Sequence, residues 1–313
     1  MRAGDTVRVR SRQDIFRTLD QSGRLDGLPF MPEMLRFCGQ TLEVVKRADK
    51  TCDSIRAPGM RRMEGAVFLS GSRCDGSAHG QCEARCLLFW KEAWLEPLGR
   101  AHRAEQEEAT SAAPVATGGP ASTCTIAVLR EATTPGSADG QPIYMCQATE
   151  LRQATSPLPA SDLSQYVRDI TSGNVRIRHA LSVFATRLVA KLAHLRDGRR
   201  QTMPTRVDMP HGPAEFRPGD RVRVRKRGEI EATLDAKGHK RGLSFSDEMV
   251  RYCGGEFRVL GPVERIVNER TGHVVTLRDC LILDGVACRG DYHRFCPRSI
   301  YAYWREAWLE KLD

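Results

Sequence analysis

The sequence has few of the features that mark a membrane protein or a secreted protein. Of its 313 residues, 41% are hydrophobic and only 6% are aromatic, and no apolar run is long enough to cross a bilayer. Residues 1–6 lead straight into a strand-like pattern, without an apolar segment of the signal-peptide type. We therefore expect no membrane association and a cytoplasmic location, where cysteines stay reduced.

The common catalytic motifs are also missing. The chain contains no P-loop, no glycine fingerprint for dinucleotides, no H-E-x-x-H and no G-x-S-x-G motif. The order of the residues alone pairs no nucleophile with a base. The sequence therefore leaves open whether the protein is an enzyme, and it names no substrate.

The charge balance is basic, with a formal net charge of +9 and a pI of about 9.1. Such an excess suits contact with nucleic acid or with an acidic macromolecular partner. Arginines on a solvated strand face would give the same composition, and both interpretations stay open. The arginines concerned lie in two short rows: Arg8, Arg10 and Arg12, and Arg221, Arg223 and Arg225.

The most informative feature that is present is an internal repeat. Three of its matching pairs are GDTVRVR (4–10) with GDRVRVR (219–225), RFCG (36–39) with RYCG (251–254), and WKEAWL (90–95) with WREAWL (304–309). The register holds over almost the whole module, with one slip of a single residue in a loop. The chain therefore contains the same module twice.

The repeat and the composition together predict five segments. A polar stretch rich in Ala, Thr, Gly and Pro follows the first copy, and two apolar patterns at helical spacing follow that stretch. The predicted order is repeat module 1 (1–99), a flexible linker (100–122), a partly helical middle segment (123–196), a second linker (197–214) and repeat module 2 (215–313).

Each module opens with an alternating strand pattern after a Gly-Asp turn, with Val7 and Val9 on one face. This Gly-Asp-x-Val-x-Val opening resembles that of small SH3-like barrels, among them translation-associated and nitrile-hydratase-type barrels. The resemblance implies a mostly β fold with short helices, in tandem SH3-like modules. It implies no activity, because the Cys-x-x-Cys-x-Cys run of nitrile hydratase is absent. We also expect a short terminal helix in each module, carrying its two tryptophans.

A set of cysteines and one histidine recurs at matching positions in the two modules. The pattern C-x4-H-x2-C appears twice, and one further cysteine precedes a glycine in each copy. Thiolate and imidazole are preferred ligands of Zn²⁺, which takes four of them in a structural site. The predicted zinc ligands are Cys38, Cys74, His79 and Cys82 in the first module, and Cys253, Cys288, His293 and Cys296 in the second. For Cys38 and Cys253, a place in the core is an equal alternative.

Four cysteines have no counterpart in the second module. They are Cys52, Cys86, Cys124 and Cys146, and the last two lie in the middle segment. Together they could form an additional all-cysteine site, and four thiolates would also accept an iron–sulfur cluster. Scattered core or surface thiols are the alternative interpretation.

Two classes of function remain after this reading of the residues. The first is a zinc-stabilised tandem-repeat protein that acts as a binding or scaffold module, for nucleic acid or an acidic partner. The alternative is a metal-dependent or iron–sulfur redox enzyme, or an accessory protein, with its centre in the cysteine-rich first module and the middle segment.

Overall fold

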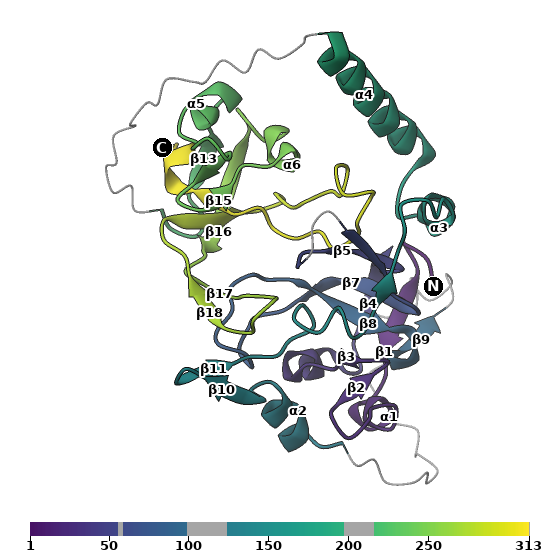
Figure 1. The fold of residues 1–313 in the computed structure, drawn as a ribbon. Helices are drawn as coiled ribbons and strands as arrows, with labels where there is room; N and C mark the ends of the chain where they lie inside the picture. Colours follow the sequence, from purple (N-terminus) through teal and green to yellow (C-terminus); the bar gives the residue numbers. More distant parts are fainter. Residues whose placement is uncertain (56–58, 99–123, 197–215, 313) are drawn as a thin grey trace. The chain divides into compact units, whose positions relative to one another are not determined.

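The structure is a computed structural model that describes residues 1–55, 59–98, 124–196 and 216–312 (Figure 1). The chain splits into two compact units, Met1–Asn174 with Val267–Val275, and Val175–Ile266 with Thr276–Asp313. Both predicted linkers, 100–122 and 197–214, lie outside the described residues. The fold is mostly β with short helices, as the sequence predicts, and its strands pair antiparallel.

The first unit is built around a five-stranded sheet of order β8-β7-β4-β1-β9. Its strands are β1 (Thr6–Val9), β4 (Thr41–Arg47), β7 (Ala66–Arg73), β8 (Leu87–Lys91) and β9 (Leu95–Leu98). Shorter strands are β2 (Arg24–Leu25), β3 (Leu28–Pro29), β5 (Lys50–Asp53), β6 (Gly59–Arg62), β10 (Gly136–Ala138), β11 (Gln141–Ile143) and β12 (Ser156–Pro157). The helices are α1 (Arg12–Phe16), η1 (Pro32–Phe37), η2 (Glu92–Trp94), α2 (Ile126–Ala132) and α3 (Ser164–Thr171).

The second unit is built around a five-stranded sheet of order β20-β19-β16-β13-β21. Its strands are β13 (Arg221–Val224), β16 (Glu256–Pro262), β19 (Cys280–Leu283), β20 (Trp304–Arg305) and β21 (Leu309–Lys311). One hairpin is formed by β14 (His239–Lys240) with β15 (Leu243–Ser244). A further hairpin, β17 (Arg265–Val267) with β18 (Val274–Thr276), is shared in the division of the chain, since its residues Val267–Val275 are grouped with the first unit. The helices are α4 (Ile177–Arg196), α5 (Arg227–Glu231), α6 (Asp247–Val250) and η4 (Glu306–Trp308).

The two large sheets have the same strand order at matching positions of the sequence repeat. The register of β4 against β7 shifts between Val44 and Lys46, and that of β16 against β19 shifts between the corresponding residues Val259 and Gly261. In β1, Val7 and Val9 are buried while Arg8 is exposed, as the alternating pattern predicts. The repeat therefore reproduces not only strands but also a local irregularity of the sheet.

The predicted terminal helix is wrong, although the tryptophans do lie in the core. Trp90 is part of strand β8, and only one 3-10 turn, η2, follows it and ends at Trp94. Both side chains are fully buried. Trp94 Nε1 donates a hydrogen bond to Thr18 Oγ1 at 3.0 Å, and in the second module Trp308 Nε1 donates to Thr233 Oγ1 at 2.9 Å. These bonds fix the ring of the second tryptophan in each module, so a single turn is enough to place it in the core.

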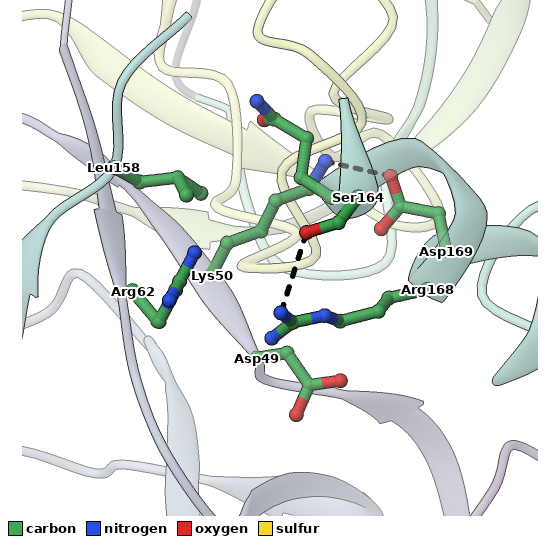
Figure 2. A pocket seen from close by; sticks show the side chains of 8 residues that line it. Asp49, Lys50, Arg62, Leu158, Ser164, Arg168 and Asp169 are labelled. Carbon is green, nitrogen blue, oxygen red and sulfur yellow. Dashed lines mark hydrogen bonds and ion pairs between the residues drawn. The ribbon is translucent and has the colours of Figure 1, made fainter. Parts of the chain in front are cut away.

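Residues 124–174 of the middle segment belong to the first unit. The buried Lys50 of β5 donates to Asp169 of α3 at 2.6 Å (Figure 2). Burial raises the pKa of Asp169 to about 6, even though Lys50 acts in the opposite direction. Residues 175–266, including α4, and 276–313 are grouped with the second unit. None of the described helices is long and apolar enough to cross a membrane.

Candidate metal centre

The loop that follows strand β7 folds back on itself at a glycine. The backbone N–H of His79 donates to the carbonyl of Gly76 at 3.1 Å, and that of Cys82 donates to the carbonyl of His79 at 3.3 Å. Gly76 has φ +69°, and a Cβ on it would lie 2.0 Å from the carbonyl oxygen of Cys82. Only glycine fits this turn, which brings both ends of the C-x4-H-x2-C pattern to one place.

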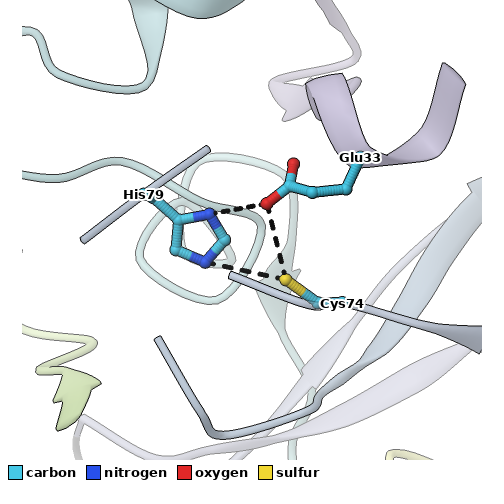
Figure 3. Close-up of side chains that lie close together, drawn as sticks. All are labelled: Glu33, Cys74 and His79. Carbon is cyan, nitrogen blue, oxygen red and sulfur yellow. Dashed lines mark hydrogen bonds and ion pairs between the residues drawn. The ribbon is translucent and has the colours of Figure 1, made fainter. Parts of the chain in front are cut away.

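His79 lies at the centre of the group that results (Figure 3). Its Nε2 is 3.7 Å from Sγ of Cys74, and its ring is also hydrogen-bonded to Cys82. Its Nδ1 is 2.9 Å from Oε1 of Glu33, which η1 carries. That carboxylate oxygen is in turn 3.7 Å from Sγ of Cys74. Glu33, Cys74 and His79 are buried, and their ligand atoms lie close enough together to hold one metal ion.

The polar atoms of this group are not fully satisfied by the protein. Oε2 of Glu33 is buried without a hydrogen-bond partner among the described residues. The His79–Glu33 contact has the length of an ion pair but lacks the alignment of a full hydrogen bond. Burying a carboxylate with one oxygen unpaired is costly. The residues present therefore fit a cation, which would offset that cost.

The titration of the group reflects the same close packing. Burial disfavours the charged imidazole, but the close thiols of Cys74 and Cys82 and the carboxylate of Glu33 outweigh it and raise the pKa of His79 far above its ordinary value. Burial also opposes ionisation of Cys82, yet the bonds from His79 and from the backbone N–H of Val267 leave its pKa lowered. For Cys74 burial prevails, and the pKa is raised.

Of the four cysteines that only the first half of the chain carries, one lies near this group. Cys146 is buried, and its thiol interacts electrostatically with His79, Cys74 and Cys82, while burial raises its pKa to about 11. Cys52 is half-buried on β5. Cys86 is also half-buried, and its carbonyl accepts the backbone N–H of Cys74. Cys124 is buried against Leu129 and Gly23. Within the described part of the chain, these four do not form a metal-holding group of their own.

Cys38 and Cys253 lie against the hydrophobic cores of their modules. Cys38 caps the C-terminus of η1, and Cys253 follows α6; both are half-buried. Each packs against the large apolar cluster of its own unit. Burial raises the pKa of both thiols. Their surroundings are those of core thiols.

The corresponding loop of the second module has the same backbone but different surroundings. Gly290 has φ +78°, and a Cβ on it would lie 2.4 Å from the carbonyl oxygen of Cys296. His293, however, is exposed, and Cys288 is half-buried. Glu248, the counterpart of Glu33, accepts backbone hydrogen bonds from Tyr292 and Arg289 instead of facing the histidine. Among the described residues, this trio is not gathered into a metal-holding group.

In the two rows of arginine, Arg8, Arg221 and Arg223 lie opposite acidic side chains, whereas Arg10 and Arg225 donate to backbone carbonyls. Arg221 and Arg223 both form ion pairs with Glu256, and Arg223 also pairs with Glu310. Arg8 is aligned across the sheet with Glu96. The glutamates neutralise part of the charge of Arg221 and Arg223, as on a solvated strand face. In the pocket beside Lys50 the charge is also neutralised, because Lys50 forms an ion pair with Asp169 (Figure 2).

Glu33 is the functional residue that the sequence alone did not single out. Its signal is the repeated Glu-Met pair, Glu33-Met34 and Glu248-Met249. Both glutamates are buried, at 5% and 4% exposure, so the pair marks an acid that each module needs inside. Comparison of the chain with protein-family models, curated proteins and solved structures finds no match. The chemistry of the site is therefore argued from its own geometry.

Proposed function

We propose that the first module binds one structural zinc ion at the group around His79, and that the protein acts as a binding or scaffold module. The observation that carries this is the position of the imidazole between Glu33 and Cys74. Two zinc ligands at about 2.0 Å (nitrogen) and 2.3 Å (sulfur) and a tetrahedral angle lie about 3.5 Å apart. The 3.7 Å between Nε2 and Sγ is close to that separation.

The carboxylate beside Nδ1 of the ring supports the same assignment. A histidine that binds zinc through one nitrogen commonly donates its other N–H to a carboxylate, which fixes the tautomer and the ring orientation. Nδ1 of His79 lies 2.9 Å from Oε1 of Glu33, while Nε2 faces Cys74 (Figure 3). We assign Glu33 to this supporting role, and Nε2 to the metal.

Burial favours a structural role over a catalytic one. His79 and Glu33 are only 2% and 5% exposed, whereas a catalytic zinc keeps one position open to water or substrate. A small β module has a thin core, and a bound ion adds folding free energy that such a core lacks. We further propose that the matching sheets are two copies of one SH3-like barrel, with the module boundaries at 1–99 and 215–313.

Metal analysis of protein purified under reducing conditions tests this proposal. We expect a colourless protein that contains zinc and melts at a lower temperature after chelation. Cys74→Ser should lose the metal, and its matched control Cys288→Ser in the second module should keep it. Iron with visible absorption, or a chain that binds no zinc, would overturn the proposal and favour the redox alternative or a metal-free core.

A further inference from the structure

We infer that Cys146 supplies the fourth ligand, so that Cys74, His79, Cys82 and Cys146 form a closed site that fastens the middle segment to the first module. This inference rests on the proposed zinc function and adds the identity of the last ligand. It also gives the ion a task, because three of the ligands come from one module and the fourth comes from a segment outside the repeat.

The polypeptide around Cys146 is held against the first module by hydrogen bonds of Gln147. The side chain of Gln147 donates to the carbonyls of Pro29 at 3.1 Å and Phe89 at 2.9 Å. Its oxygen accepts the backbone N–H of Phe89 at 2.8 Å. Gln147 is itself buried. The residue next to Cys146 is therefore fixed on strand β8, and the thiol of Cys146 has little freedom of position.

The same segment also runs beside the loop that carries His79. A Cβ on Gly80 would lie 2.9 Å from the ring of Tyr144. Only a glycine next to His79 therefore lets these two segments approach so closely. The backbone N–H of Tyr144 donates to the carbonyl of Gly272 at 2.8 Å. Tyr144 and Gln147 thus fix the polypeptide on both sides of Cys146, next to the loop that carries His79.

The donor set fits a closed zinc site. Three thiolates and one imidazole are a common structural ligand set for zinc. Each sulfur also receives a backbone N–H, which stabilises a thiolate. Gly76 donates to Cys74 at 3.3 Å, Val267 donates to Cys82 at 3.3 Å, and Thr149 donates to Cys146. With Cys146 as fourth ligand, Glu33 remains outside the metal shell, on Nδ1 of His79.

X-ray absorption at the zinc edge of the intact wild-type protein tests this ligand set without any substitution. We expect three sulfur ligands at about 2.3 Å and one nitrogen at about 2.0–2.1 Å. Two sulfurs with two lighter ligands would place Glu33 in the shell and overturn the inference, while leaving the zinc function intact. Protein without zinc would instead overturn the proposed function itself.

Substitution of the two buried cysteines of the middle segment gives the second test. Cys146→Ser should lower zinc affinity by more than the roughly 10–100-fold that loss of an outer-shell partner costs. It should also increase hydrogen exchange in residues 143–155. Cys124→Ser, the matched control, also removes a buried thiol of this segment and should keep its zinc. Equal zinc affinity in the two variants would overturn the role of Cys146.

Discussion

Residues 74–82 of the first module and 288–296 of the second have the same turn but different neighbours. In both loops the histidine N–H bonds back to a glycine with positive φ, and the last cysteine N–H bonds to the histidine carbonyl. His79 is buried between a thiol and a carboxylate, whereas His293 is exposed. The spacing of the ligands thus fixes the loop, but the elements around the loop decide whether the side chains converge.

The surroundings of the second loop explain why it differs. Asp291 is buried there and pairs with Arg251 and with His179 of α4. The corresponding position in the first module is Ser77, and its neighbour Asp75 pairs with Arg36 near the surface. The second loop is therefore stabilised by ion pairs and by backbone bonds to Glu248. Substitutions at matching positions should separate the two arrangements.

The largest effect is expected from replacing the turn glycines. Gly76→Ala and Gly290→Ala each force alanine into a left-handed backbone, which costs about 1–3 kcal/mol, and push its Cβ against the backbone of a cysteine. We expect a loss of roughly 2–4 kcal/mol in the free energy of unfolding for both. Only Gly76→Ala should also lose zinc, which metal analysis of the purified variants would show.

The control for the turn glycines is Gly219→Ala. Gly219 has φ +94°, but a Cβ there would meet nothing within 4 Å, so this variant carries the backbone cost alone. Its loss of stability should be smaller than that of Gly290→Ala, measured by urea unfolding. If Gly76→Ala keeps its zinc, the turn does not position the ligands, and the comparison of the two loops loses its basis.

The two buried glutamates should give a smaller and more selective effect. Glu33→Gln removes the carboxylate that orients His79, and loss of such a partner lowers metal affinity by about 10–100-fold. Glu248→Gln should leave zinc affinity unchanged, because Glu248 accepts backbone hydrogen bonds from its loop instead of facing the histidine. It should instead lower the free energy of unfolding by about 1–3 kcal/mol, since the amide cannot accept both bonds.

Zinc affinity of the glutamate variants is best measured by competition with a chromophoric chelator. The melting temperature of the metal-free proteins provides the second readout. A Glu33→Gln variant that binds zinc as tightly as the wild type would remove Glu33 from the site. An equal loss of affinity in Glu248→Gln would mean that the second module also binds the ion.

The sequence predicted the local features of the two loops better than the contacts that decide which side chains converge. Strand alternation at Val7 and Val9, the shared turn and the convergence of Cys74 with His79 follow from local patterns. The proposal of Cys146 as fourth ligand, in place of Cys38, does not follow from a local pattern, because it depends on a contact between segments far apart in the chain. The role of Glu33 could not be predicted for a related reason. Its repeat partner Glu248 is equally buried and yet forms different hydrogen bonds.

The smallest expected effect concerns the first tryptophan of each module. Trp90 Nε1 donates to Ser72 Oγ at 3.0 Å, whereas Trp304 Nε1 is buried without a partner among the described residues. Val286 stands at the position that corresponds to Ser72. Ser72→Ala should therefore cost about 1 kcal/mol in the free energy of unfolding, because it leaves the N–H of Trp90 unpaired.

The reverse change, Val286→Thr, should be nearly neutral in stability. The new hydroxyl oxygen can accept the N–H of Trp304, and the hydroxyl can donate to the carbonyl of Leu283, which already accepts the N–H of residue 286 at 3.2 Å. Val222→Thr changes an equally buried position without the unpaired tryptophan N–H as a partner. It should therefore lower the free energy of unfolding by roughly 1–3 kcal/mol. Urea unfolding of the two variants compares them directly. An equal cost would mean that Trp304 gains nothing from a partner, and that the two modules differ here only in sequence.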